Sequence, residues 1–460
     1  MKMKPIFILS VLLVSVFAIQ EPTGVILLFR HGARGPIDDS FEKTWENMYG
    51  ELTGVGMRQQ YLRGAYLAQL YPQLFSQYNS NNYYIRSTDY NRTLMSVYSL
   101  LDGLLYEKGP TFIDNYPFER AYPPYTANFL DKNMDVFPHK YQAVPIHTVE
   151  TSSDELLLGN DPKVCPIAAK LISNQTEEPT YKEVVAKFKQ TISEVSKRMN
   201  STTVLSIDQL EDLEDTIIAN YFEQKQLPGD IDPNSELGKN LTFLIMYKTY
   251  FLEIGSTLQR QLSSMNLMNQ FKADLQSILQ SSDPSVKLYS AHDSTLAPIL
   301  AVTGIATHDC LYKNFFENGT YTSCYYPKFA SQIRIEAWKN DTDLNSSEIR
   351  FYFDEAPQNL CNSETGHCTW KDFQSLIDTY TQGKDINYFR SMCASESQSS
   401  PSNNTTNGTD SVAEIPDGPD IGLKYAIYAL TAFAGVLFVG IIYCIGKKID
   451  RESETEAQLI

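Results

Sequence analysis

Apolar residues along this chain follow two spacings, and the spacings alternate. Short runs rich in apolar residues are typical of buried strands, and they occur at 24–29 (GVILLF), 83–86 (YYIR) and 286–292 (VKLYSAH). Apolar residues at three- and four-residue intervals predict helices at 56–71, 89–107 and 294–304. Strands that alternate with helices favour an α/β domain with a mainly parallel sheet flanked by helices.

Two further stretches have different patterns of apolar and polar residues. Residues 154–253 are mostly helical in pattern and rich in charge, as in 181–199 and 206–224, and they predict a smaller helical cap domain inserted into the α/β domain. Segments 330–338 and 347–354 alternate in the manner of an antiparallel strand pair. The α/β domain is therefore expected to comprise residues 19–153 and 254–395.

The two ends of the chain predict a type I membrane protein. Residues 1–18 resemble a secretory signal peptide, with a basic start and a short apolar core. Residues 424–446 are long and apolar enough for a transmembrane helix. Residues 396–423 read as a polar stalk and 447–460 as a cytosolic tail, because Lys447 and Lys448 follow the membrane segment directly. A GPI signal is the competing interpretation, but a charged tail follows the apolar stretch.

Cysteines and glycosylation sequons agree with a location outside the cytosol. Of seven cysteines, Cys444 lies in the membrane segment. The remaining six can form three disulfides, whose pairing the sequence alone leaves open. The sequons in the predicted lumenal domains include Asn174, Asn200, Asn240, Asn318, Asn340 and Asn345. An acidic dileucine-like end, ESETEAQLI, favours a lysosomal or endosomal membrane, and the cell surface is the alternative.

Net charge excludes one class of partner. The formal net charge is −17, from 38 Lys and Arg against 55 Asp and Glu. Such an acidic chain is not expected to bind nucleic acid.

Unusual residues follow the ends of the three predicted strands. Active sites in open α/β sheets lie beyond the carboxyl ends of the strands. These ends deliver six side chains that are expected to surround one point: Arg30, His31, Arg34, Arg92, His292 and Asp293. Three arginines would repel one another unless an anion compensates them, and the planar guanidinium matches phosphate oxygens. Each residue alone has an ordinary structural interpretation, such as a basic surface turn, so the prediction rests on their joint occurrence.

Several stretches resemble the histidine acid phosphatase family, in the branch of the lysosomal and prostatic enzymes. RHGARGP (30–36) is similar to the family signature R-H-G-x-R-x-P. ELTGVGMRQQYLRG (51–64), IRSTDYNRTLMSV (85–97), VPIHTV (144–149) and SAHDSTL (290–296) resemble further landmarks in the same order. Ala33 and Gly35 differ from the Asp and Ser found in many relatives. The resemblance covers about residues 24–395.

The resemblance implies a phosphoglycerate mutase-like fold and an acid phosphatase acting on phosphate monoesters. His31 would form a phosphohistidine, and Asp293 would protonate the leaving alcohol. Arg30, Arg34, Arg92 and His292 would bind the phosphoryl oxygens. No cofactor or metal is expected, and the arginines should lower the pKa of His31.

The resemblance also suggests pairings and assembly. It implies disulfides Cys165–Cys393, Cys310–Cys324 and Cys361–Cys368, and a homodimer. Asn91-Arg92-Thr93 is a sequon too, but a glycan beside Arg92 would block the site, so Asn91 is expected to be unmodified.

Two other functions compete with this one. A phytase or other inositol-polyphosphate phosphatase would share the same core, although a polyanionic substrate would favour a basic cap and this cap is acidic. A catalytically inactive phosphate-binding surface glycoprotein is the third reading.

Overall fold

One seven-stranded sheet organises the part of the chain that the computed structural model describes, which is residues 21–394 without 42, 47 and 111–136. Its strands are β1 (Gly24–Arg30), β2 (Tyr83–Ser87), β3 (Ser285–Ala291), β4 (Gln332–Trp338), β5 (Glu348–Phe353), β6 (Ala356–Gln358) and β7 (Cys368–Thr369). The order is β2-β3-β1-β4-β5-β6, and β7 pairs with β5.

The sheet is mixed, and its parallel part lies at one side. Strand β1 runs parallel to β3, and β3 runs parallel to β2, whereas β4 pairs with β1 and β5 in antiparallel fashion. Arg30 is opposite Ala291, and Ser87 is opposite Ser290, so the three parallel strands end at the same level. This arrangement confirms the predicted α/β fold with helices around a sheet, including the antiparallel pair. The sheet is mixed rather than mainly parallel, because among the described strands only the β1–β3 and β2–β3 pairs are parallel.

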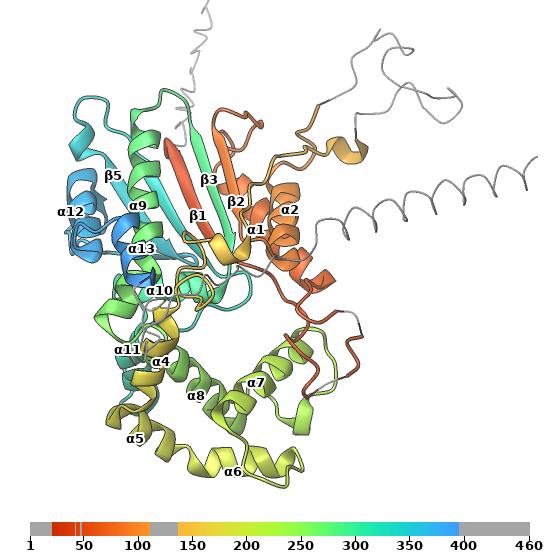
Figure 1. Ribbon diagram of the computed structural model, residues 1–460. Helices are drawn as coiled ribbons and strands as arrows, with labels where there is room; N and C mark the ends of the chain where they lie inside the picture. The colour runs from red at the N-terminus through yellow and green to blue at the C-terminus, as the bar shows by residue number, and fades with distance from the viewer. Residues whose placement is uncertain (1–20, 42, 47, 111–136, 395–460) are drawn as a thin grey trace, which may run out of the picture. The chain divides into compact units, whose positions relative to one another are not determined.

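Strand β1 is buried on both faces, which explains its unbroken apolar run. Val25, Leu27 and Phe29 pack into one apolar cluster with α1 (Gly54–Leu70) and α2 (Asn91–Leu104). Ile26 and Leu28 point the other way, into a cluster with α9 (Thr257–Gln280), α10 (Asp293–Val302) and α12 (Trp370–Thr381). Full burial of one such side chain stabilises the fold by about 1.5–3 kcal/mol. Figure 1 shows the sheet between these two groups of helices.

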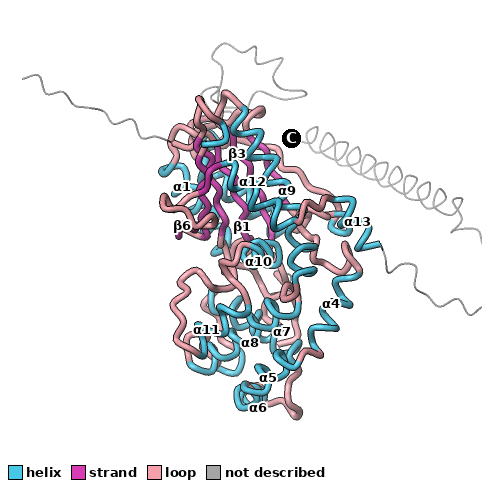
Figure 2. Tube along the Cα trace, turned by 90° about the vertical axis from the view of Figure 1, so that its left-hand side faces the viewer, coloured by secondary structure: helices cyan, strands magenta, loops and turns pink. Residues whose placement is uncertain are grey.

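The predicted cap region is helical throughout most of its length. It contains α4 (Ile167–Thr176), α5 (Pro179–Lys187), α6 (Lys189–Arg198), α7 (Ile207–Phe222) and α8 (Glu236–Leu252). Ser206 begins α7 with a capping box that it forms with Gln209. Figures 1 and 2 show α4–α8, together with α11 (His308–Phe316), beyond one end of the sheet. Apolar residues of α5–α8 share one continuous cluster with Ile26 and Leu28, and the domain boundaries stay a prediction.

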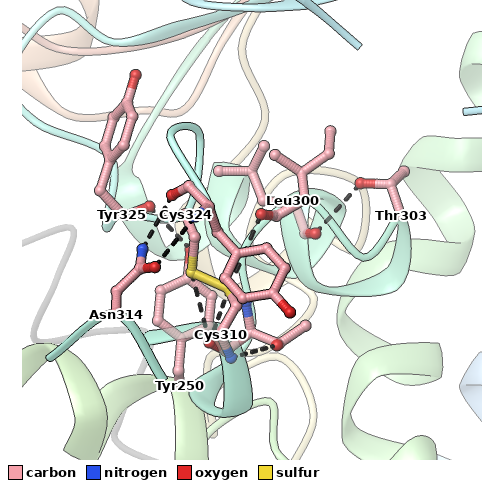
Figure 3. The surroundings of a disulfide bond; sticks show 10 residues. Tyr250, Leu300, Thr303, Cys310, Asn314, Cys324 and Tyr325 are labelled. Atoms are coloured by element: carbon pink, nitrogen blue, oxygen red, sulfur yellow. Dashed lines mark hydrogen bonds between the residues drawn. A yellow bond between two sulfur atoms is a disulfide. The ribbon is translucent and has the colours of Figure 1, made fainter. Parts of the chain in front are cut away.

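Three disulfides stabilise the peripheral segments, and they are the pairs that the resemblance suggested. Cys165–Cys393 ties the segment before α4 to α13 (Ile386–Ala394), and Cys361–Cys368 closes a short loop before β7. Cys310–Cys324 joins α11 to the following loop (Figure 3). Beside that bond, the Tyr250 hydroxyl of α8 donates to the Tyr325 carbonyl.

Several predictions concern segments outside the described residues. The signal peptide (1–18), stalk (396–423), membrane helix (424–446) and tail (447–460) all fall there. Among the helices of residues 21–394 that are described, none is long and apolar enough to cross a membrane. Of the six predicted glycosylation sites, Asn240 and Asn340 are half-buried and the others are exposed.

Candidate active site

The loops after the three parallel strands meet at one point. Arg30 is the last residue of β1, and His31 follows it. Strand β3 ends at Ala291, and His292 is the N-cap of α10, whose first residue is Asp293. The rings of His31 and His292 lie 5.5 Å apart between centroids, in an edge-to-face arrangement. Arg34 comes from the β1 loop, and Arg92 lies in the first turn of α2 after β2.

The contacts of His31 fix the chemistry of its ring. His31 is 2% exposed, and its Nδ1 lies 2.8 Å from the Gly32 carbonyl oxygen. A carbonyl only accepts, so Nδ1 carries the hydrogen and Nε2 carries the lone pair. Burial, and then the positive charges of Arg30 and Arg34, hold the pKa of His31 well below its ordinary value. Both effects favour the neutral form of the His31 ring.

The three arginines differ in their contacts. Arg30 donates to the Pro327 carbonyl at 2.7 Å and contacts the Asp293 carboxylate at 2.6 Å. Arg34 pairs with Asp215, and Arg92 makes no ion pair with a described residue. In all three, the Nε–H is buried without a hydrogen-bond partner in the described part of the chain. Buried donors of this kind favour an anion that can accept from them.

Arg92 is the most strongly perturbed of the arginines. Burial and then the neighbouring Arg34 lower the pKa of Arg92 to about 10, so that it stays charged at any relevant pH. Its guanidinium lies 4.4 Å from the ring centre of Tyr90. No group of three or more His, Cys, Asp or Glu side chains among the described residues is arranged to hold a metal ion.

A chain of hydroxyl groups orients His292. Its Nε2 lies 2.9 Å from the Thr88 Oγ1, which itself donates to the Thr93 Oγ1 at 2.9 Å. Thr88 therefore accepts from His292, and Nε2 carries the ring hydrogen. Burial and then Arg92 hold the pKa of His292 well below its ordinary value. The hydroxyl contacts fix the orientation of the ring, and the lowered pKa favours its neutral form.

Helix α1 holds the β1 loop from behind. The Ala33 N–H donates to the Gln59 Oε1 at 2.8 Å, and the Gln60 amide donates to the Arg30 carbonyl at 2.8 Å. Gly32 packs directly on the backbone of Gly56, because a Cβ at Gly32 would lie 2.3 Å from the Gly56 carbonyl oxygen. These contacts give a physical reason for the motif over residues 51–64.

Sequence reasoning missed two residues that contact the site from a distance in the chain. Asp215 of α7 binds Arg34, and the Phe329 ring lies 4.5 Å from the Arg30 guanidinium and 5.8 Å from the His31 ring. No local signal marks either one. Only the packing of α7 and of the loop before β4 brings them to the β1 loop.

The family profile described as the histidine phosphatase superfamily (branch 2) matches residues 23–354. The chain belongs to this superfamily. Its curated relatives include the lysosomal acid phosphatases of Xenopus laevis and Homo sapiens. The first is 26% identical over 371 residues, covering 77% of this chain and 75% of the relative. The second is 27% identical over 372 residues, covering 77% of each chain.

Two solved phytase structures are similar in fold to this chain. The tartrate complex of Hafnia alvei phytase has a TM-score of 0.55 at 12% identity, covering 78% of this chain and 97% of that one. The Klebsiella phytase has a TM-score of 0.53 at 15% identity, covering 79% and 95%. At such identities, these structures establish the histidine phosphatase fold alone.

Proposed function

We propose that this protein is an acid phosphatase that hydrolyses phosphate monoesters in a lysosomal or other lumenal compartment. One observation carries the proposal: three guanidinium groups and two buried histidines converge beside Asp293 at the ends of parallel strands. The superfamily membership and the acid phosphatases among the relatives support it.

In the proposed reaction, the His31 Nε2 attacks phosphorus and the bond from phosphorus to the ester oxygen breaks. Asp293 transfers its proton to the departing oxygen, which leaves as an alcohol. Water then attacks the phosphohistidine and gives a proton to the Asp293 carboxylate. Phosphate is released, and the His31 Nε2 regains its lone pair.

The phosphoryl oxygens would be held by Arg30, Arg34 and Arg92. His292 would join them only with its N–H turned away from Thr88, because that hydrogen is engaged by Thr88 in this structure. Negative charge spreads over these oxygens in the transition state, and fixed donors stabilise it there without reorganising. Arg30 contacts Asp293 in this structure, and a general acid has to carry a proton. We therefore infer that a bound phosphoryl group draws Arg30 away from Asp293.

A polyanionic substrate suits this site poorly. Asp215 of α7 pairs with Arg34, so the cap places one carboxylate at the edge of the site, whereas burial raises the pKa of the neighbouring Glu214 to about 7 and keeps it mostly protonated at acidic pH. An additional phosphate on a substrate such as phytate would approach the Asp215 carboxylate and be repelled. Simple monoesters meet no such repulsion.

A turnover assay at about pH 5 tests the proposal. The purified protein should release phosphate from an aryl phosphate faster than from phytate, and His31→Ala should abolish turnover while keeping the melting temperature. Retained turnover in His31→Ala would exclude the assigned nucleophile. Tight binding of phosphate without any turnover would indicate the inactive binding protein instead.

The finer location is part of the same proposal. A helix over residues 424–446 would anchor the protein with its catalytic domain lumenal or extracellular, and two copies would associate as a homodimer. Carbonate extraction of membranes tests the anchor, and light scattering of the purified protein tests the dimer. The six predicted glycans fit a lumenal domain.

A further inference from the structure

Asp215 lies 181 residues from Arg34 in the sequence, and its carboxylate binds the Arg34 guanidinium through both oxygens. Its Oδ1 accepts from the Arg34 Nη2 at 2.7 Å, and its Oδ2 accepts from the Arg34 Nη1 at 3.0 Å. The same Oδ2 accepts from the Ile37 backbone N–H at 2.9 Å. The side chain of Arg34 is 7% exposed and that of Asp215 is 23% exposed. A two-point contact between planar groups fixes the rotation of the guanidinium as well as its position.

These bonds determine which donors of Arg34 remain for a ligand. Nη1 also donates to the Gly35 carbonyl at 2.9 Å, so both of its hydrogens are engaged. Nη2 uses one hydrogen on Asp215. The Nε–H has no partner among the described residues. Arg34 can therefore offer a phosphoryl group only its Nε–H and one hydrogen of Nη2, in a fixed plane.

Asp215 also changes the charge that a phosphoryl group meets. Arg30 is paired with Asp293, and Arg34 is paired with Asp215, while Arg92 makes no ion pair with a described residue. With both histidines neutral and Asp293 ionised, the six predicted site residues and Asp215 together carry a charge of about +1. Without Asp215 the same set would carry one more positive charge and would attract free phosphate more strongly.

We propose that Asp215 is a positioning residue that fixes the Arg34 guanidinium for catalysis and weakens the binding of the phosphate product. This inference rests on the proposed phosphatase function. Asp215 contacts Arg34 and is not expected to touch the substrate, whereas Asp293 is expected to touch the leaving group itself. Through Asp215, helix α7 thereby supports the site as well as covering it.

Neighbouring contacts show why α7 can act as a rigid support. The Trp45 indole N–H donates to the Asn220 side chain at 2.8 Å, one helical turn and a residue beyond Asp215. Farther along, the Phe222 ring lies 5.3 Å from the Phe329 ring, which packs on Arg30. Helix α7 thus contacts the loop after β1 through Asp215 and Asn220, and it contacts Phe329 beside Arg30 through Phe222.

Three variants of the full chain separate the effects. Asp215→Asn removes the charge but keeps the shape, and Asp215→Glu keeps the charge with a longer reach. Asp212→Asn is the matched control, because Asp212 lies exposed on the same helix and its carboxylate makes no hydrogen bond or ion pair with a described residue. For each variant, kcat and KM are measured with an aryl phosphate, and the inhibition constant Ki is measured with inorganic phosphate.

We expect Asp215→Asn to lower kcat about tenfold and to lower both KM and Ki about tenfold, since a unit charge near the edge of solvent changes affinity by that order. Asp215→Glu should keep Ki within about threefold of the wild type. Asp212→Asn should match the wild type in all three constants. A purely structural role for Asp215 would instead lower the melting temperature and leave Ki unchanged.

The proposal is wrong if Asp215→Asn behaves like Asp212→Asn, or if its Ki for phosphate rises. An inactive wild type would refute the phosphatase function without deciding this inference. In that case, phosphate titration followed by calorimetry still tests it, because Asp215→Asn should bind phosphate more tightly than the wild type. Equal or weaker binding there would overturn the role of Asp215.

Discussion

Glu253 makes the stability of this protein depend on pH in a predictable direction. It caps the C-terminus of α8 and is half-buried, and none of the described residues forms an ion pair with it. Burial, and then the negative charge of Glu211, raise the pKa of Glu253 from 4.5 to about 7. The negative end of the helix dipole acts in the same direction. The folded protein therefore keeps this carboxyl protonated at mildly acidic pH.

The sign of the effect follows from linkage. A raised pKa in the folded state means that the contribution is fully present below about 4.5 and is lost as the pH rises through about 7. A rise of this size corresponds to about 3 kcal/mol as an upper limit. Partial exposure of the side chain reduces the expected value to about 1–2 kcal/mol.

Glu253→Gln removes the ionisation while keeping the shape. We expect the variant to match the wild type at about pH 5 and to be more stable by about 1–2 kcal/mol at about pH 7.5. Urea unfolding at both pH values measures this difference. His31 and His292, whose lowered pKa values destabilise the fold as the pH falls, cancel between variant and wild type. Exposed Glu183 on α5 provides the control Glu183→Gln. A gain that is equal at both pH values would refute the reasoning.

Three further changes have defined outcomes. Asp293→Asn should lower kcat about 10²–10⁴-fold. The loss should be smaller for aryl than for alkyl phosphates, because an aryloxide is less basic than an alkoxide and leaves more easily without a proton donor. Steady-state kinetics on both substrates checks this. Replacing Cys165 and Cys393 by Ser should reduce the free energy of unfolding by about 2–5 kcal/mol in urea titrations, since the bond closes a long loop. Asn91 should carry no glycan in peptide mass spectra, because its Nδ2 donates to the Glu51 carboxylate at 2.9 Å and it adjoins Arg92.

The local pattern of apolar residues predicted the parallel strands, because this pattern reflects how each strand is buried. The run 24–29 is apolar at every position after Gly24 because β1 packs on both faces, and the strand ends deliver His31 and His292 to one edge. The mixed strand order could not be predicted, since β4 could have paired elsewhere along the sheet. The apolar pattern did not predict helix α9, because buried polar residues such as Gln261 and Asp274 interrupt its apolar face.

The candidate site was predictable where it depends on strand ends and not where it depends on packing between distant helices. Asp215 lies 181 residues from Arg34, and its helix pattern does not distinguish it from its acidic neighbours. The carboxylate that binds Arg34 is set by how α7 docks on the β1 loop. That docking is a tertiary property, so no spacing rule along the chain contains it.

The sequence attributes the low pKa of His31 to the arginines, whereas burial is its largest cause in the structure. This difference matters for catalysis at acidic pH. The three arginines do lower the pKa of His31, but burial contributes more. Two of those arginines are partly neutralised by Asp293 and Asp215, so their charge alone would be a weaker device. Burial needs no net positive charge and therefore favours a neutral His31, the proposed nucleophile, without strengthening the binding of the phosphate product. A site that combines a desolvated histidine with paired arginines can attack at acidic pH and still release phosphate.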